Sequence, residues 1–180
     1  MTHQVWDQVI NQLGRTIDAK YGGRAYLLRW LATAIHTDSW VPVLCLHGAV
    51  MSGKSTIWQM LQEIIPSWVN VAHRLEHYMP RVDERFVVLV SNDHWSEPQT
   101  RKLRKLVHLR PHVRWILESL TSLPFDSRDF TTRIHCLGLD TPWDAKALRT
   151  MLNREWSAFY HTLRDHVLPT IPCIDTRDQP

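Results

Sequence analysis

The segment LHGAVMSGKSTIW, residues 46–58, carries the most specific pattern in the sequence. Within it, Gly48, Gly53, Lys54 and Ser55 fit G-x-x-x-x-G-K-[ST], the pattern of a phosphate-binding loop. An apolar run precedes the loop at 41–46, and a helical pattern of apolar residues comes after it at 54–65. A strand, a glycine-rich turn and a helix in this order aim backbone N–H groups and the positive end of a helix dipole at one point. The segment therefore predicts a phosphate site at the end of a buried strand.

The loop residues also predict how a nucleotide is held. The candidate binding residues are Gly48, Ala49, Val50, Met51, Ser52, Gly53, Lys54, Ser55 and Thr56. We expect Lys54 to reach the β- and γ-phosphates of ATP and the Ser55 hydroxyl to bind Mg²⁺, so the expected cofactors are ATP and Mg²⁺. The alternative is an ordinary glycine- and serine-containing turn before a helix.

A nucleoside triphosphatase also needs an acidic residue at the end of a neighbouring strand. The apolar run RFVVLV at 85–90 predicts such a strand, and Asp93 lies shortly after it. We take Asp93 as the candidate that binds Mg²⁺ and orients the attacking water. Because Ser91 and Asn92 occupy the places where acidic residues are usual, either the strand end bulges to present Asp93 or the acid is supplied elsewhere.

Composition indicates a globular domain without a disulfide framework. The chain has 180 residues, of which 44% are hydrophobic and 22% charged, and its formal charge of +3 does not by itself indicate a nucleic-acid partner. Cys45, Cys136 and Cys173 are odd in number and scattered, which favours a reducing compartment. The N-terminus has no signal-peptide pattern, and no apolar run approaches the roughly 20 residues of a membrane span. We therefore expect a cytoplasmic protein with no membrane partner.

The rest of the sequence alternates helical and strand patterns. Helices are expected at 4–20, 24–36, 97–110, 142–152 and 154–167, and strands at 41–46, 68–72, 85–90, 113–120 and 133–139. This order predicts an α/β fold of the P-loop NTPase (AAA+/RecA-like) type, with a parallel sheet flanked by helices. We expect a helical lead-in at 1–40, the core at 41–140, short C-terminal helices at 141–168 and a flexible tail at 169–180. Trp6, Trp30, Trp156, Phe159 and Leu163 are expected in the core.

Three passages resemble the ATPase domain of phage- and plasmid-type primase-helicases, in the superfamily 3 branch of the AAA+ P-loop ATPases. They are the helical lead-in and Walker A loop at 26–56, RFVVLVSND at 85–93 in the place of Walker B, and ESLTSLPFDSRDFTTRIHCLGL at 118–139 in the place of the sensor strand, a turn and the next strand. The resemblance implies that Thr121 lies near the polar sensor position. It also implies that Arg133, or alternatively Arg128, is an arginine finger that reaches the nucleotide of the next subunit. An exposed position at the edge of a strand is the other interpretation of Arg133.

A basic helix is predicted between the segment RFVVLVSND at 85–93 and the sensor strand. In EPQTRKLRKLVHLRP, Leu103, Leu106 and Leu109 are expected on one apolar side. The charged residues on the remaining surface are Arg101, Lys102, Arg104 and Lys105. Such residues could bind the phosphates of single-stranded DNA without reading bases, or they could form a solvated helix face. A second short match, H-x-x-E-H at His73–His77, would place two histidines on one helical face as in zinc proteases, but it has no identifiable third ligand.

These features support three hypotheses for function. The first is an ATP-binding, ATP-hydrolysing helicase-type motor domain that acts on DNA during replication of a phage or other mobile element. It implies single-stranded or forked DNA, a homo-oligomeric ring and a primase or initiator protein as partners. The second is a small-molecule or nucleotide kinase, although about 40 helical residues precede the loop and no acceptor-binding lid is evident. The third is a nucleotide-binding interaction module whose hydrolysis has decayed.

Overall fold

The computed structural model describes residues 4–14, 23–49, 54–91, 95–120, 131–135 and 145–173. It has an α/β fold built on a parallel sheet with the strand order β2-β3-β4-β1-β5. The strands are β1 (Val43–His47), β2 (Val69–Ala72), β3 (Phe86–Ser91), β4 (Arg114–Ser119) and β5 (Thr131–His135). The helices are α1 (Gln4–Gly14), α2 (Gly23–His36), α3 (Thr56–Ile64), α4 (Glu97–Leu109) and α5 (Ala145–Leu163). Short 3₁₀ turns are η2 (Pro66–Trp68), η3 (Leu75–His77) and η4 (Arg164–His166).

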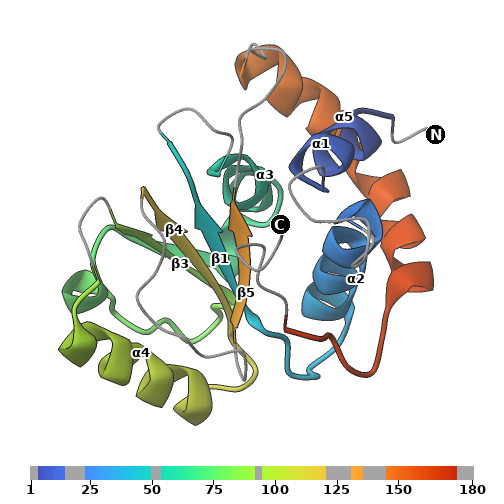
Figure 1. Cartoon of the computed structure of the whole chain (residues 1–180). Helices are drawn as coiled ribbons and strands as arrows, with labels where there is room; N and C mark the ends of the chain where they lie inside the picture. The colour runs from blue at the N-terminus through green and yellow to red at the C-terminus, as the bar shows by residue number, and fades with distance from the viewer. Residues whose placement is uncertain are drawn as a thin grey trace, which may run out of the picture.

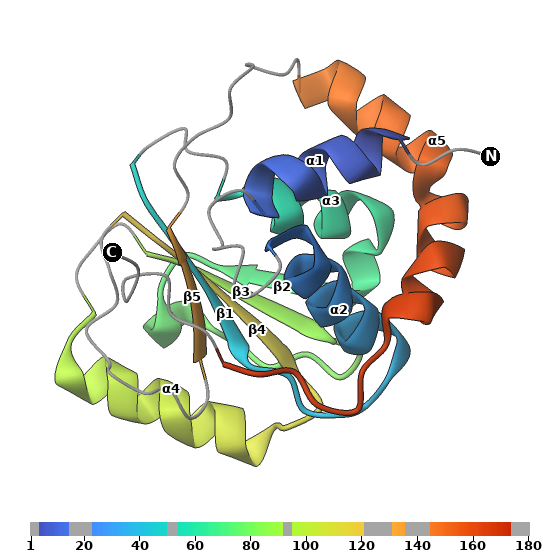
Figure 2. The ribbon, with the colours of Figure 1, turned by 45° about the vertical axis from the view of Figure 1, so that its right-hand side comes forward.

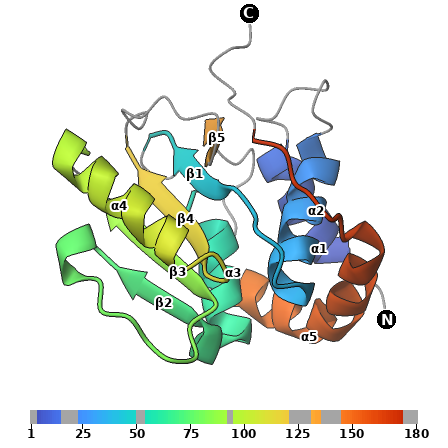
Figure 3. The ribbon, with the colours of Figure 1, turned by 90° about the horizontal axis from the view of Figure 1, so that it is seen from below.

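Helices cover both faces of the sheet, as the alternating sequence pattern predicts. Figure 1 shows α4 on one face and α1, α2, α3 and α5 on the other. The same two layers are visible after a 45° rotation in Figure 2 and from below in Figure 3. Because every strand pair is parallel, the carboxyl ends of all five strands lie at one edge of the sheet. That edge is where open α/β sheets bind their ligands.

The strands separate the core into two clusters because successive side chains point to opposite faces. On β4, Trp115 and Leu117 pack in the cluster beneath α4, whereas Ile116 packs in the larger cluster beneath the other helices. The aromatic residues expected in the core are there: Trp6, Trp30, Phe159 and Leu163 are buried, and Trp156 packs partly buried against them. The Trp6 ring stacks on Phe159 with centroids 4.3 Å apart, which joins α1 to α5.

Two arginines fasten the C-terminal end of α2 to the amino end of the sheet. Arg85 and Arg114 each donate hydrogen bonds to the carbonyl oxygens of Ala34 and Thr37. These carbonyls carry the negative end of the helix dipole and have no partner within the helix, so guanidinium groups suit them. Burial lowers the pKa of Arg114 to about 10, which still leaves it charged at neutral pH.

The structure corrects the predictions for the C-terminal part of the chain. We predicted two helices, at 142–152 and 154–167, but α5 is one helix from Ala145 to Leu163 that ends in the 3₁₀ turn η4. Its only weak helix former between the two predicted parts is Asn153, and no glycine or proline interrupts it. Residues 169–173, assigned to the flexible tail, pack on the fold: Ile171 is buried, and the Pro172 carbonyl accepts a hydrogen bond of 2.9 Å from the Tyr26 hydroxyl.

Candidate nucleotide-binding site

The two ends of the phosphate-binding loop lie where β1 stops and α3 starts. Gly48 comes directly after β1 and has a φ of 148°, a value that residues with a Cβ disfavour. Lys54 precedes α3 and is only 4% exposed. Its ammonium donates hydrogen bonds to the carbonyl oxygens of Gly48, at 2.8 Å, and of Ala49. The lysine is therefore held at the loop rather than extended into solvent. Residues 50–53 of the loop lie outside the described part of the chain.

Ser55 directs its hydroxyl away from the helix that it precedes. It occupies the N-cap position of α3, yet its side chain makes no capping hydrogen bond. Instead, Ser55 Oγ donates to Glu118 Oε1 at 2.9 Å. The other oxygen of the same carboxylate, Oε2, accepts a hydrogen bond of 2.6 Å from Trp58 Nε1, one turn further along α3. Both oxygens of Glu118 are thus bound by residues at the start of α3.

Glu118 reaches this place because of the strand order. It lies on β4, which is inserted between β1 and β3, and pairs in register with Leu46 of β1 and Val90 of β3. The alternation along β4 puts Glu118 on the same face as Ile116, the face that α3 covers. We did not single out Glu118 from the sequence. The available signal was a charged residue at a core-facing position near the end of the apolar run VRWIL.

The residues present fit a magnesium ion. Mg²⁺ prefers oxygen ligands and is usually bound through one or two carboxylates together with phosphate oxygens and water. The Ser55 hydroxyl and the Glu118 carboxylate supply two such oxygens next to the phosphate-binding loop. Within the described ranges, no group of three or more His, Cys, Asp or Glu residues is placed to hold a metal ion by itself. A magnesium ion that binds together with a nucleotide does not require such a group, because phosphate oxygens and water supply the other ligands.

Of the other predicted catalytic residues, only Arg133 lies in the part of the chain that the structure describes. Asp93, Thr121 and Arg128 lie outside the described residues. Arg133 was expected at the start of a strand at 133–139, just before IHCLGL, but β5 begins at Thr131. Arg133 is therefore the third residue of the strand and pairs in register with Cys45 of β1. The two residues before it, Thr131 and Thr132, are β-branched and favour extended structure, which explains the earlier start.

The basic helix forms as predicted and its charged residues are on the surface. Arg101, Lys102, Arg104 and Lys105 are all exposed on α4. The buried side differs from our expectation: Leu103 and Val107 face the sheet, whereas Leu109 is 66% exposed in the last turn. The helix begins at a capping box, in which Ser96 and Gln99 bond each other's backbone N–H groups.

A pocket of about 300 Å³ adjoins the first turn of α4. It lies between η3, the last residues of β3 and the start of α4. Its lining residues include Arg74, His77, Trp95 and Gln99. Leu89 and Val90 of β3 place the pocket near the carboxyl edge of the sheet, the edge that also carries the phosphate-binding loop.

The zinc-protease match does not have the structure that such a site requires. Leu75–His77 is a 3₁₀ turn rather than part of an α-helix, so His73 and His77 do not share a helical face.

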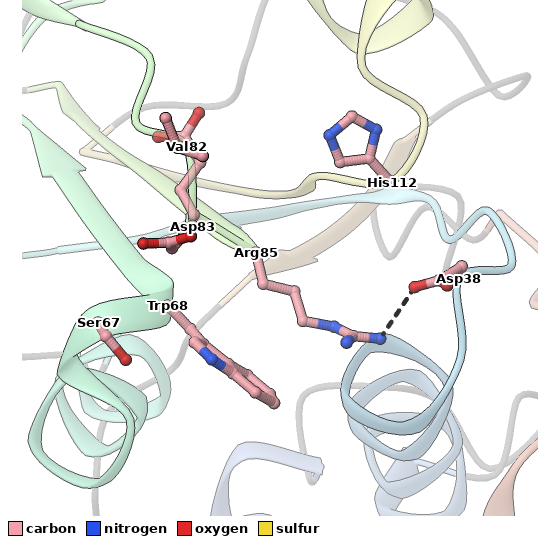
Figure 4. Close-up of a pocket in the computed structure, with 8 residues that line it drawn as sticks. Asp38, Ser67, Trp68, Val82, Asp83, Arg85 and His112 are labelled. Carbon is pink, nitrogen blue, oxygen red and sulfur yellow. Dashed lines mark hydrogen bonds and ion pairs between the residues drawn. The ribbon is translucent and has the colours of Figure 1, made fainter.

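A second pocket, of about 450 Å³, lies at the opposite end of the sheet. Asp38, Trp68, Asp83, Arg85 and His112 line it, and all of them precede the strands to which they lead (Figure 4). Arg85 lies over the Trp68 ring at 5.3 Å and is 3.5 Å from Asp38, and it also bonds the end of α2. These contacts give the Arg85 side chain a structural role, far from the phosphate-binding loop.

Comparisons with known proteins identify the fold. No protein-family model matches the sequence, and no curated protein matches it. Three solved structures of the C-terminal region of NrS-1 share the fold. An A form apo structure has a TM-score of 0.67 at 14% identity and covers 91% of this chain and 46% of that one. An apo structure of residues 305–718 has a TM-score of 0.60 at 18% identity, with the same coverage.

The third, an A form apo structure of residues 305–718, has a TM-score of 0.63 at 16% identity and covers 93% of this chain and 48% of that one. The present chain therefore spans slightly less than half the length of these structures. At such identities the likeness establishes a shared fold. Separately, none of the described helices has the length and apolar character needed to cross a bilayer.

Proposed function

We propose that this chain is an ATP-binding and ATP-hydrolysing motor domain that acts on DNA during replication of a phage or other mobile element. The observation that carries the proposal is the convergence of the Lys54 ammonium, the Ser55 hydroxyl and the Glu118 carboxylate at the carboxyl end of β1. The motif resemblance to primase-helicases and the fold shared with the NrS-1 C-terminal region support the same assignment.

The roles of the residues derive from their chemistry. Lys54 exchanges the Gly48 and Ala49 carbonyls for β- and γ-phosphate oxygens, to which a cationic donor binds more strongly. The N–H groups at the start of α3 add the positive end of the helix dipole. Mg²⁺, when bound, neutralises charge on the phosphates. In hydrolysis, the oxygen of a water molecule bonds to the γ-phosphorus and the bond from the γ-phosphorus to the β–γ bridging oxygen breaks. ADP leaves with that oxygen, phosphate forms, and the proton of the water passes to solvent.

The proposed DNA contact is the exposed surface of α4. The helix carries four exposed cationic side chains but a single acidic residue, Glu97 in its first turn. The Glu97 carboxylate forms an ion pair of 3.2 Å with Arg101. Lysine and arginine rows of this kind bind backbone phosphates without regard to sequence. The 300 Å³ pocket beside the first turn offers an adjacent surface with an aromatic residue, Trp95.

Assembly into a ring is proposed through β5. This strand is the last in the described strand order and lies next to β1, the strand that leads into the phosphate-binding loop. An arginine on this strand suits a finger that stabilises charge on a neighbouring subunit's nucleotide. Arg133 is the proposed finger, with Arg128 as the alternative.

The test is the ATPase rate of the full chain with and without single-stranded DNA, measured together with its mass in solution. We expect turnover that DNA stimulates and that Lys54→Ala abolishes. Turnover that requires a small acceptor and ignores DNA would indicate a kinase instead. Tight ATP binding without turnover in the wild type and in Asp93→Ala would indicate an interaction module.

A further inference from the structure

The surroundings of Glu118 distinguish it from an ordinary polar residue at a strand end. Its two oxygens are bound by Ser55 and Trp58, at 2.9 and 2.6 Å, and neither partner is a cation. These two hydrogen bonds therefore do not neutralise a carboxylate that lies beside a loop whose sequence is typical of phosphate binding.

A carboxylate next to a triphosphate is unfavourable unless a cation lies between them. Two like charges about 4 Å apart repel each other near a protein surface. A divalent cation reverses this effect because it attracts both the carboxylate and the phosphates. The Ser55 hydroxyl, which we expect to bind Mg²⁺, is already hydrogen bonded to Glu118.

We propose that Glu118 is the acidic residue that holds Mg²⁺ at this site, and that Trp58 is the positioning residue that fixes its carboxylate. This inference rests on the proposed function and assigns to β4 the role that Asp93, after β3, was expected to fill. When Ser55 turns its hydroxyl to the metal, Glu118 Oε1 becomes free to bind the same ion. The Trp58 indole keeps Oε2, so the carboxylate stays aimed at the loop.

Glu118→Gln is a suitable variant because it preserves the apo contacts. An amide oxygen can accept from Trp58 Nε1, and an amide nitrogen can donate to the Ser55 hydroxyl oxygen. The change therefore removes the charge and one metal-binding oxygen while leaving a hydrogen-bonding group of the same shape. The matched control is Glu63→Gln, at an exposed position near the end of α3.

The experiment measures the affinity of a non-hydrolysable ATP analogue, adenylyl imidodiphosphate, in Mg²⁺ and in EDTA. The ratio of the two affinities isolates the metal contribution from the Lys54 contribution. We expect Glu118→Gln to lower this ratio at least about tenfold, with weaker binding in Mg²⁺ and, because the repelling charge is gone, equal or tighter binding in EDTA. Asp93→Asn and Glu63→Gln should keep the wild-type ratio.

Trp58→Phe tests the positioning role, with Trp68→Phe as its control at the other end of the sheet. Loss of the indole N–H frees the Glu118 carboxylate to change its orientation, so we expect the ratio to fall several-fold while the melting temperature and EDTA affinity stay close to wild type. A purely structural Trp58 would lower the melting temperature without moving the ratio, and that result would overturn the positioning role.

The outcomes separate this inference from the proposed function. If wild type binds the analogue with a clear Mg²⁺ enhancement and Glu118→Gln retains that enhancement, Glu118 does not hold the metal. If Asp93→Asn alone removes it, the acid lies after β3 as the motif suggested. If the wild type does not bind the analogue in either buffer, the proposed function itself fails.

Discussion

The Ser55 hydroxyl donates a hydrogen bond of 2.9 Å to Oε1 of Glu118, a residue 63 positions further along the chain. The contact depends on β4 lying directly beside β1, so that the end of one strand meets the helix that comes after the other. Lys54, the neighbour of Ser55, bonds the loop carbonyls at the same edge. An ammonium, a hydroxyl and a carboxylate therefore gather where α/β sheets bind ligands.

The first prediction concerns Lys54. Lys54→Ala removes an ammonium that we expect to make charge-assisted hydrogen bonds to phosphate, each worth about 1.5–3 kcal/mol. The affinity for ATP, measured by isothermal titration calorimetry, should fall at least about tenfold. Lys102→Ala on the exposed surface of α4 is the control and should bind ATP like wild type. Equal ATP affinities of Lys54→Ala and wild type would contradict the assignment of the loop.

The α/β class, and the strand and helix on either side of residues 48–55, could be predicted because both depend on local sequence. Apolar runs such as VPVLCL and RFVVLV form buried parallel strands, and the helical periods between them require crossovers to parallel neighbours. The order of the strands is not a local property. Without it, nothing in the segment VRWILES shows that Glu118 meets Ser55 rather than a residue at the end of β3.

Element ends were harder to predict than elements. Leu109 was expected on the apolar side of the helix with Leu103 and Leu106, yet it is 66% exposed as the last residue of α4. Likewise, the break predicted between 142–152 and 154–167 is absent, and the helix-propensity cost of Asn153 at that point is only a few tenths of a kcal/mol. Packing of Leu152 and Phe159 in the core easily outweighs such a cost.

The second prediction concerns α4. Replacing Arg101, Lys102, Arg104 and Lys105 together by Gln should weaken binding to single-stranded DNA. It should also reduce the slope of log affinity against log salt concentration by up to about 3, since each phosphate contact contributes about 0.7. Because all four side chains are exposed, the free energy of unfolding should change little. Binding to labelled oligonucleotides over a salt series measures the slope.

A charge-matched control separates local contacts from net charge. Arg104→Gln with Lys105→Gln on α4 should lower the slope by up to about 1.4, whereas Arg154→Gln with Arg164→Gln, at exposed positions in α5 and η4, should not. Equal effects of the two pairs would show that DNA responds to overall charge rather than to this helix.

The third prediction concerns Arg114, which is fully buried and donates to four carbonyl oxygens, those of Ala34, Thr37, Pro111 and His112. Arg114→Met keeps much of the volume but removes all of these donors. Bonds from a charged group are worth about 1.5–3 kcal/mol each, and Arg85 still serves two of the carbonyls, so we expect a loss of about 3 kcal/mol. Urea unfolding measures it, with the exposed Arg101→Met as control. A loss below about 1 kcal/mol would contradict the role of Arg114.

The last prediction is a dependence of stability on pH through Glu84. Its side chain is fully buried and bonds Tyr78, Asn70 and Arg110. Burial by itself raises the pKa of Glu84, but the hydrogen bonds from Tyr78 and Asn70 and the contact with Arg110 outweigh it and lower the pKa below its usual 4.5. The unfolded chain therefore binds the proton more readily, so the contribution is complete above about pH 4.5 and is lost as pH falls through the folded-state pKa.

Glu84→Gln tests this dependence because Gln does not titrate. At pH 7 the variant should be about 3 kcal/mol less stable than wild type, since it leaves the partly buried Arg110 without its carboxylate. The difference should shrink as pH falls below 4.5 and through the folded-state pKa of Glu84, where wild type loses the charged pair. Urea unfolding at pH 7, 4.5 and 3.5 measures both proteins, and the exposed Glu63→Gln should match wild type at each pH. A gap between wild type and Glu84→Gln that stays constant with pH would show that the Glu84 charge does not stabilise the fold.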